Sequence, residues 1–294
     1  MNSNDIKMEA EIFFDSYLPD ALRQALEYAG ENGFVASMPA LLHARANAAY
    51  DNIIWNTWFN PHTEETVART AQGNHVVVTV HGGGIFGSPA RFEKLFLANT
   101  SRFCEIGFTG LFAAKITERE AFDVLEGKLP DGSEFPVYPF GEFTRGVADL
   151  PRRYAVVMDF EMAKNCRSGY QKFDDLKDDP LMIVRAGGVE AATAYLDKAR
   201  GRNNTAKMGC WHPFNSITDT NQPQTRVPAL AGNKGGIGTE DNDGHLYGYD
   251  AEYGMGGDSS IHNTSMINVA RYVAVAPRNE KTSVRHLPFN AYDI

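Results

Sequence analysis

Residues 75–91 read HVVVTVHGGGIFGSPAR, and they constrain the fold more than any other stretch of the chain. Val76 to Val80 form a run of apolar and β-branched residues that predicts a buried strand. Glycines follow at once, and Ser88-Pro89 then predicts the start of a helix. A strand, a glycine turn and a helix start bring free backbone N–H groups and the positive end of a helix dipole together. The stretch therefore predicts an anion-binding site.

Two further stretches predict related units. Residues 154–160 (YAVVMDF) predict a strand, and residues 181–185 (LMIVR) predict another that leads through Gly187-Gly188 into a helix over 189–200. Repeated strand, turn and helix units are typical of a sheet that is at least partly parallel and covered by helices. We therefore predict an α/β fold, with a mixed or mostly parallel sheet and flanking helices, formed by a single domain over residues 1–294.

The rest of the chain predicts a helical beginning and a loop-rich end. Residues 1–60 carry helical spacing over 5–30 and 39–58, and Thr117 with Glu120 predicts a capping box at the start of a helix over 117–126. Residues 201–257 are rich in Gly, Asn, Asp, Thr and Pro, which predicts a loop-rich segment of the kind that covers a functional site. Residues 260–276 predict a helix, or a helix leading into a strand.

Composition excludes several classes of function. The 294 residues include 37 acidic and 28 basic side chains, for a net charge of −9, and this argues against nucleic acid or an anionic membrane as partner. The acidic N-terminal residues do not match the pattern of a secretory signal, so none is expected, and the sequence has no apolar run of membrane-spanning length. The three cysteines are widely spaced and show no zinc-binding pattern, which fits reduced thiols. We expect a soluble, cytoplasmic protein.

The glycine stretch suggests a phosphate or nucleotide as the ligand. Gly82, Gly84 and Gly87 satisfy the GxGxxG pattern between a strand and a helix, and Gly83 and Ser88 add further backbone and hydroxyl donors. The acidic residue that a dinucleotide requires about twenty positions later is not well placed, so a simpler phosphate or nucleotide-like anion is the expected small-molecule partner. Lys234 lies in a second glycine-rich loop and is expected to reach a phosphate, although this loop lacks the full P-loop pattern.

Acid–base residues accompany this expected site. Asp159 and Glu161 lie at the end of the strand predicted over 154–160, and His81 precedes the glycines. Since the carboxyl ends of parallel strands meet at one rim of a sheet, these side chains are expected to lie together with the glycine turns. Our main hypothesis is an enzyme, a transferase or a hydrolase, in which His81, Asp159 or Glu161 transfers protons to or from an anionic substrate.

Residues 76–88 also resemble the HGGG segment of the hormone-sensitive-lipase branch of the α/β-hydrolases, and residues 257–263 (GDSSIHN) resemble the GDSxGGN nucleophile segment of that family. The resemblance implies an esterase, with the glycine N–H groups as oxyanion hole and Ser259 as nucleophile. Ile261 stands where the family has a glycine. His262, next to small polar residues, is a further candidate for general acid or base.

Two other possibilities complete the sequence hypotheses. One is a non-enzymatic structural or self-assembling protein, a homo-oligomer whose aromatic side chains and glycine-rich loops make subunit contacts. The other is metal binding by residues 239–250, which partly match a calcium loop but carry threonine at the first position and aspartate at the twelfth. No metal ligand is therefore assigned, and the expected cofactor is left open between a nucleotide and a divalent metal.

Overall fold

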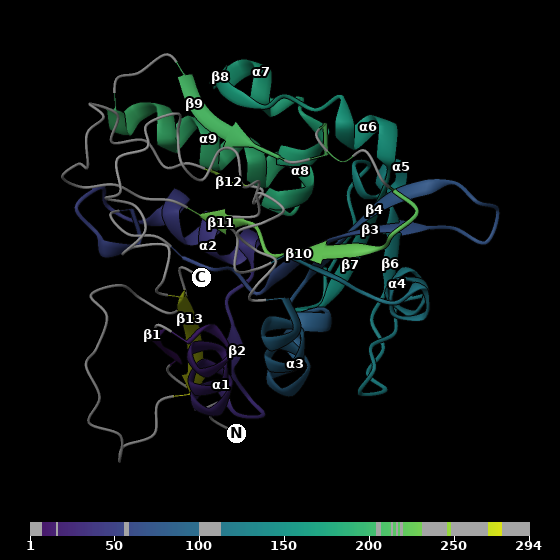
Figure 1. Cartoon of the computed structure of the whole chain (residues 1–294). Coiled ribbons are helices and arrows are strands. Elements are labelled where there is room, and N and C mark those ends of the chain that lie inside the picture. Colours follow the sequence, from purple (N-terminus) through teal and green to yellow (C-terminus); the bar gives the residue numbers. More distant parts are fainter. Residues whose placement is uncertain are drawn as a thin grey trace, which may run out of the picture.

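The computed structural model describes residues 8–15, 17–55, 59–99, 113–203, 207–212, 214–215, 217, 220–230, 246–247 and 270–277. Within these ranges the strands form three sheets with helices packed around them (Figure 1). The strands are β1 (Met8–Asp15), β2 (Phe34–Val35), β3 (Thr63–Arg69), β4 (His75–His81), β5 (Ala113–Lys115), β6 (Val137–Pro139), β7 (Tyr154–Asp159), β8 (Gly169–Lys172), β9 (Lys207–Trp211), β10 (Gln224–Arg226), β11 (Ala229–Leu230), β12 (Leu246–Tyr247) and β13 (Ala270–Pro277). The helices are α1 (Leu18–Ala29), α2 (Met38–Asn47), α3 (Pro89–Asn99), α4 (Glu118–Leu125), α5 (Phe140–Phe143), α6 (Phe160–Lys164), α7 (Phe173–Lys177), α8 (Pro180–Ala186) and α9 (Val189–Asn203), with short 3-10 helices η1 (Ile53–Trp55) and η2 (Ile85–Gly87).

The first sheet joins the two ends of the described chain. β1 pairs antiparallel with β13 over its whole length, from Met8 opposite Pro277 to Asp15 opposite Ala270, and β2 pairs with the other side of β13. Helix α1 packs against β13 (Figure 1). The prediction of a helix over residues 5–30 is therefore wrong for its first part. Those residues form β1 because they pair with β13, whose residues lie far away in the sequence.

The central sheet has the order β5-β10-β3-β4-β7-β6. β4 is antiparallel to both of its neighbours, β3 and β7, and within the described residues β6 and β7 are the parallel pair of this sheet. A mixed sheet with flanking helices is confirmed, whereas a mostly parallel one is wrong. The tight turn at residues 70–74 makes β3 and β4 a hairpin, with the Thr70 N–H donating to the Asn74 carbonyl over 2.9 Å.

The apolar run of β4 has a different cause from the one predicted. Val77 contributes to a core on one face of the central sheet, while Val76, Val78 and Val80 contribute to a second core on the other face. A strand buried on both faces is apolar throughout, whichever way its neighbours run. The run therefore predicted the strand correctly but contained no information about parallel pairing.

The third sheet, β11-β12-β9-β8, lies on the side of the molecule that also holds α7, α8 and α9 (Figure 1). The strand predicted over residues 181–185 is wrong, because this segment forms α8. Its residues are buried all round the helix, so no polar face reveals the helical period. Asp179 caps the N-terminus by accepting from the Met182 N–H, and Gly187 ends the helix with a left-handed φ of 88°.

Other local predictions are confirmed. The predicted capping box at Thr117 is present at the start of α4, the strand over residues 154–160 forms β7, and the helix that begins at Val189 forms α9. Of the helix expected over 39–58, α2 ends at Asn47 and η1 follows. Most of the predicted loop-rich segment 201–257 lies outside the described residues. None of the helices in the described ranges combines the length and the apolar character that crossing a bilayer requires.

Candidate functional site

The N–H groups of the glycine loop, residues 82–87, do bind an acidic group, and that group is a carboxyl side chain of the same protein. The carboxylate of Glu64 on β3 accepts hydrogen bonds through Oε1 from the backbone N–H of Gly84 at 2.9 Å and of Gly87 at 3.1 Å. Thr225 on β10 donates its hydroxyl to Oε2 of the same carboxylate over 3.4 Å. The donors predicted for a phosphate are therefore occupied from within.

Internal packing explains why glycine occupies the first three positions of this loop. A Cβ on Gly82, whose φ is +84°, would lie 2.3 Å from the carbonyl oxygen of Arg152. On Gly83 it would lie 2.4 Å from Nε2 of His62, and on Gly84 it would lie 2.7 Å from Oε2 of Glu64. The loop is folded closely over β3, and its sequence requires no external ligand to account for it.

The Glu64 carboxyl is buried, and its hydrogen-bond donors within the described residues are backbone N–H groups and a hydroxyl, with no basic side chain among them. Burial raises the pKa of this carboxyl to about 7, although the backbone N–H groups of residues 84–87 act in the opposite direction. Ser88, which was also predicted to contact the ligand, lies just before α3, where its carbonyl accepts from the Phe92 N–H over 2.8 Å.

His81 is a structural link between elements of the core. Its Nε2 lies 3.0 Å from the carbonyl oxygen of Val184 on α8, and its Nδ1 lies 3.0 Å from Oγ1 of Thr63 on β3. The Thr63 hydroxyl oxygen accepts from the Met38 N–H over 2.9 Å, so its own proton can be donated to Nδ1. These contacts fit a neutral imidazole that carries its proton on Nε2. The side chain is 0% exposed and out of reach of a substrate.

The burial of His81 predicts a pH dependence of stability. Burial lowers the pKa of His81 from 6.5 to about 3. The neutral ring of the folded state therefore contributes stability fully above pH 6.5, and this contribution is lost as the pH falls from 6.5 towards 3. We expect His81→Gln to be less stable than the parent chain at pH 7.5, by an amount that shrinks as the pH approaches 4. Urea unfolding followed by circular dichroism measures this difference, and parallel pH profiles for the two proteins would contradict it.

The two carboxylates expected near His81 lie elsewhere. In the antiparallel pairing of β4 with β7, His81 is opposite Tyr154 and Val76 is opposite Asp159. Five strand positions separate His81 from Asp159 along the sheet, roughly 17 Å. Asp159 caps α6 by accepting from the N–H groups of Glu161 and Met162 at 2.9 and 3.1 Å, and Glu161 lies 3.6 Å from Lys164 on the surface. The expected rim does not form because the strands run in opposite directions.

Three predicted site residues, Lys234, Ser259 and His262, lie outside the described residues. So does the partial calcium loop at 239–250, apart from Leu246 and Tyr247, which form β12. Within the described ranges, no group of three or more His, Cys, Asp or Glu side chains is arranged to hold a metal ion.

Sequence reasoning missed a second buried carboxylate next to Glu64. Glu65 points to the opposite face of β3 and forms a two-pronged ion pair with Arg185 on α8, with Nε to Oε1 at 2.6 Å and Nη2 to Oε2 at 3.0 Å. Both side chains are 0% exposed. The available signal was the turn-forming sequence Gly73-Asn74, which predicts a hairpin and places Thr63-Glu64-Glu65-Thr66 beside the apolar β4.

Two of the glycines predicted to share a rim do come together, at a groove of about 920 Å³. Gly82 from the glycine loop and Gly187 from the turn between α8 and α9 both line it. The end of α1, β2 and the start of α2 form one wall, and residues 150–154 form another. Most of this lining is apolar.

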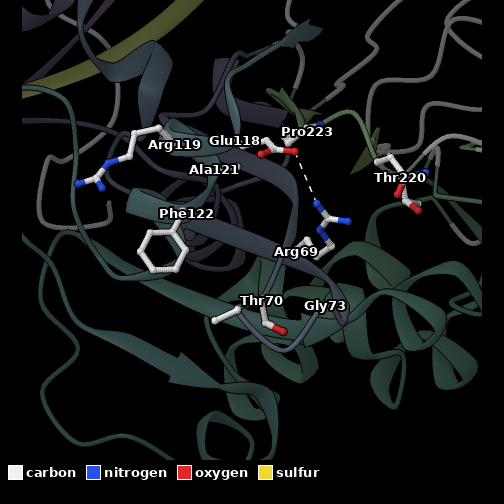
Figure 2. A pocket seen from close by; sticks show the side chains of 11 residues that line it. Arg69, Thr70, Gly73, Glu118, Arg119, Ala121, Phe122, Thr220 and Pro223 are labelled. Atoms are coloured by element: carbon white, nitrogen blue, oxygen red, sulfur yellow. Dashed lines mark ion pairs between the residues drawn. The ribbon is translucent and has the colours of Figure 1, made fainter.

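A second pocket, of about 490 Å³, lies at the edge of the central sheet between the hairpin turn of β3 and β4, helix α4 and residues 220–223. Figure 2 shows Arg69 and Glu118 directed toward each other across it, as an ion pair of 3.5 Å. Both side chains are largely exposed, at 46% and 77%. Such a pair contributes little to stability, and the pocket is an open surface feature.

Comparison with known proteins identifies the fold. No family model matches the sequence, and no curated protein matches it. The structure is similar to a solved structure from work described as "Accommodation of massive sequence variation in Nanoarchaeota by the C-type lectin fold", with a TM-score of 0.59 and 21% sequence identity. The similarity covers 93% of this chain and 99% of the other. The chain therefore has the fold of that protein.

This fold corrects the functional hypothesis. An enzyme for phosphorylated or nucleotide-like molecules was predicted from a strand, glycine loop and helix in a parallel sheet, and the C-type lectin fold overturns that prediction. The esterase hypothesis is wrong for the same reason. The physical cause of the error lies in Glu64, because a glycine loop that binds an internal carboxylate has the same sequence pattern as one that binds a ligand.

Proposed function

We propose that this chain is a non-enzymatic recognition protein built on a C-type lectin fold. The observation that carries the proposal is the similarity over 93% of the chain to a lectin-fold protein. The work on that protein describes the C-type lectin fold as accommodating massive sequence variation in Nanoarchaeota, and the two chains are only 21% identical. A scaffold that keeps its fold through such divergence is suited to presenting different binding surfaces on one framework. Since fold alone does not fix function, the geometry must support the same conclusion.

The described side chains fit a framework better than a catalytic centre. His81 is enclosed by β3 and α8, Asp159 caps a helix, and the N–H groups of the glycine loop are bonded to Glu64. General acid–base catalysis requires groups that reach the substrate. These three groups instead hold elements of the scaffold in place, which supports recognition without chemical conversion.

The proposal is tested by measuring binding and turnover on the same protein. Thermal melts of the full chain with a panel of sugars and organic acids detect ligands, because binding to the folded state raises the melting temperature. Mass spectrometry of the recovered ligand then reveals any conversion. We expect at least one ligand to stabilise the chain and to be recovered unchanged.

A turnover control uses p-nitrophenyl acetate and p-nitrophenyl phosphate, which report on the two overturned enzyme hypotheses. We expect release of p-nitrophenol no faster than with serum albumin at the same concentration. Saturable hydrolysis that disappears in Asp159→Asn or Glu161→Gln would show that the chain is an enzyme and would end the proposal.

A further inference from the structure

The groove between β2, α2 and the glycine loop has the properties of a small-molecule site. Its volume of about 920 Å³ lies within the range of ligand pockets, which are mostly apolar with a few polar groups at fixed positions. Phe34, Pro39 and Leu150 supply apolar surface. Neither Glu64 nor Glu65 lines this groove.

Two arginines line this groove, and neither forms an ion pair with an acid in the described part of the chain. Arg152 donates from Nη1 to the carbonyl oxygens of Asn32 and Gly33, both at 3.3 Å, and its guanidinium lies 4.8 Å from the ring centre of Phe34. These bonds occupy one of its three nitrogens.

Arg153 is held in a similar way. It donates from Nε to the Gly82 carbonyl at 3.0 Å and from Nη1 to the Ser133 hydroxyl at 2.9 Å, which leaves Nη2. The Ser133 hydroxyl that Arg153 contacts also donates to Asp131, and the hydrogen bonds from Ser133, together with the charge of Arg153, lower the pKa of that carboxyl. Glu134 is the acid in the lining, against these two arginines, so the groove favours an anion. The backbone bonds fix both guanidinium groups in position before any ligand arrives.

Two nearly buried polar side chains in the lining lack hydrogen-bond partners. His62 is 7% exposed, and its Nε2 has no partner in the described structure. Tyr154 is 4% exposed and is held by ring contacts with His81 and Phe143, while its hydroxyl makes no hydrogen bond to any described residue. The hydroxyl lies beside Gly187, at 3.3 Å from where a Cβ on that residue would stand. A fully buried polar atom such as Nε2 of His62 is rarely left unsatisfied without a reason. The Tyr154 hydroxyl is in a different position, because Tyr154 lines the groove and a ligand there can reach its oxygen.

We propose that the groove binds a small organic acid, with its carboxylate held by Arg152 and Arg153 and its apolar body against Phe34 and Leu150. The planar guanidinium fits a carboxylate better than it fits a neutral group. The Tyr154 hydroxyl donates to the ligand and so gains the partner that it lacks in the protein alone. This inference rests on the proposed recognition function and specifies its ligand class.

The test compares acids with their amides on the full chain. Isothermal titration is carried out with octanoate and phenylacetate, and with octanamide and phenylacetamide as neutral counterparts. We expect both acids to bind and to raise the melting temperature, and the amides to bind at least tenfold more weakly. Equal binding of acid and amide, or no binding of either acid, would overturn the inference.

Variants locate the binding in the groove. Arg152→Gln and Arg153→Gln are each expected to weaken octanoate binding by tenfold or more, whereas Arg119→Gln, which changes an arginine that is 79% exposed in the other pocket, leaves it unchanged. Tyr154→Phe removes only the unpartnered hydroxyl, so it should keep the melting temperature and weaken binding on the order of tenfold. This variant decides the question even if an arginine variant fails to fold, and unchanged affinity in it would count against the site.

Failure of the inference is distinguishable from failure of the proposed function. An acid that binds and is converted to a product would refute recognition without chemistry while leaving the groove as the site. Acids that do not bind at all would refute the groove while leaving the recognition function to other ligands.

Discussion

Replacing Arg185 with methionine is expected to destabilise the folded chain by about 3–5 kcal/mol, the largest effect of any substitution considered for this protein. Arg185 neutralises Glu65, and both side chains are 0% exposed. Without the guanidinium, Glu65 keeps its desolvation cost and loses its ion pair and hydrogen bonds, so it must either stay charged in the core or take up a proton. The free energy of unfolding, measured in urea, reports this loss.

A double variant separates the ion pair from the space that it fills. Arg185→Met combined with Glu65→Leu removes both charges, and we expect it to be more stable than Arg185→Met alone, because apolar replacement of a buried pair is often neutral. Arg69→Met serves as the control, since its partner Glu118 is exposed and the expected change is within about 1 kcal/mol. Equal destabilisation by Arg185→Met and Arg69→Met would show that the buried ion pair contributes no more to the free energy of unfolding than the exposed one.

Gly84→Ala is expected to destabilise the chain by about 2–3 kcal/mol. The new Cβ would lie 2.7 Å from Oε2 and 2.8 Å from Cδ of Glu64, whose carboxylate is held in place by the Gly84 and Gly87 N–H groups. Relieving the clash requires the carboxylate to move away from its own hydrogen-bond donors. Thermal and urea unfolding of the variant measure the cost.

Shortening the acid provides the matched test. Glu64→Asp withdraws the carboxylate by one methylene, so the double variant with Gly84→Ala should lose less stability than the sum of the two single changes. Gly141→Ala is the control glycine, because a Cβ on Gly141 would meet no described atom within 4 Å. A Gly84→Ala chain as stable as Gly141→Ala would mean that Glu64 does not fill the loop.

Elements whose sequence signals lie within a few neighbouring residues could be predicted from the sequence. The capping box at Thr117 and the apolar run of β7 depend on neighbouring residues, and both predictions are confirmed. β1 could not be recognised in this way, because the residues that pair with it are Ala270 to Pro277. Helix α8 was mistaken for a strand since its buried residues surround the axis and include Ile183 and Val184, which also favour strands.

In the candidate site, too, the local features could be predicted and those that depend on long-range pairing could not. The spacing of the glycines correctly indicated a loop whose N–H groups converge on an anion, but spacing does not say whether the anion comes from outside. Glu64 is one of 37 acidic residues, and only the pairing of β3 with β4 directs it at this loop. The groove could not be predicted for a related reason. Arg152 and Arg153 belong to no motif, and the strand pattern that begins at Tyr154 does not indicate which residues from α1, β2 and α2 lie opposite it.

The pairing of β1 with β13 has a consequence for how the chain is made. Met8 and Pro277 are 269 positions apart, so a strand that is synthesised early waits for a partner that leaves the ribosome much later. Contacts of such long range slow folding, and until they form the unpaired edge of β1 is available to other chains. The first sheet is therefore completed only once residues 270–277 have emerged, and refolding of the intact chain should be slow and sensitive to protein concentration.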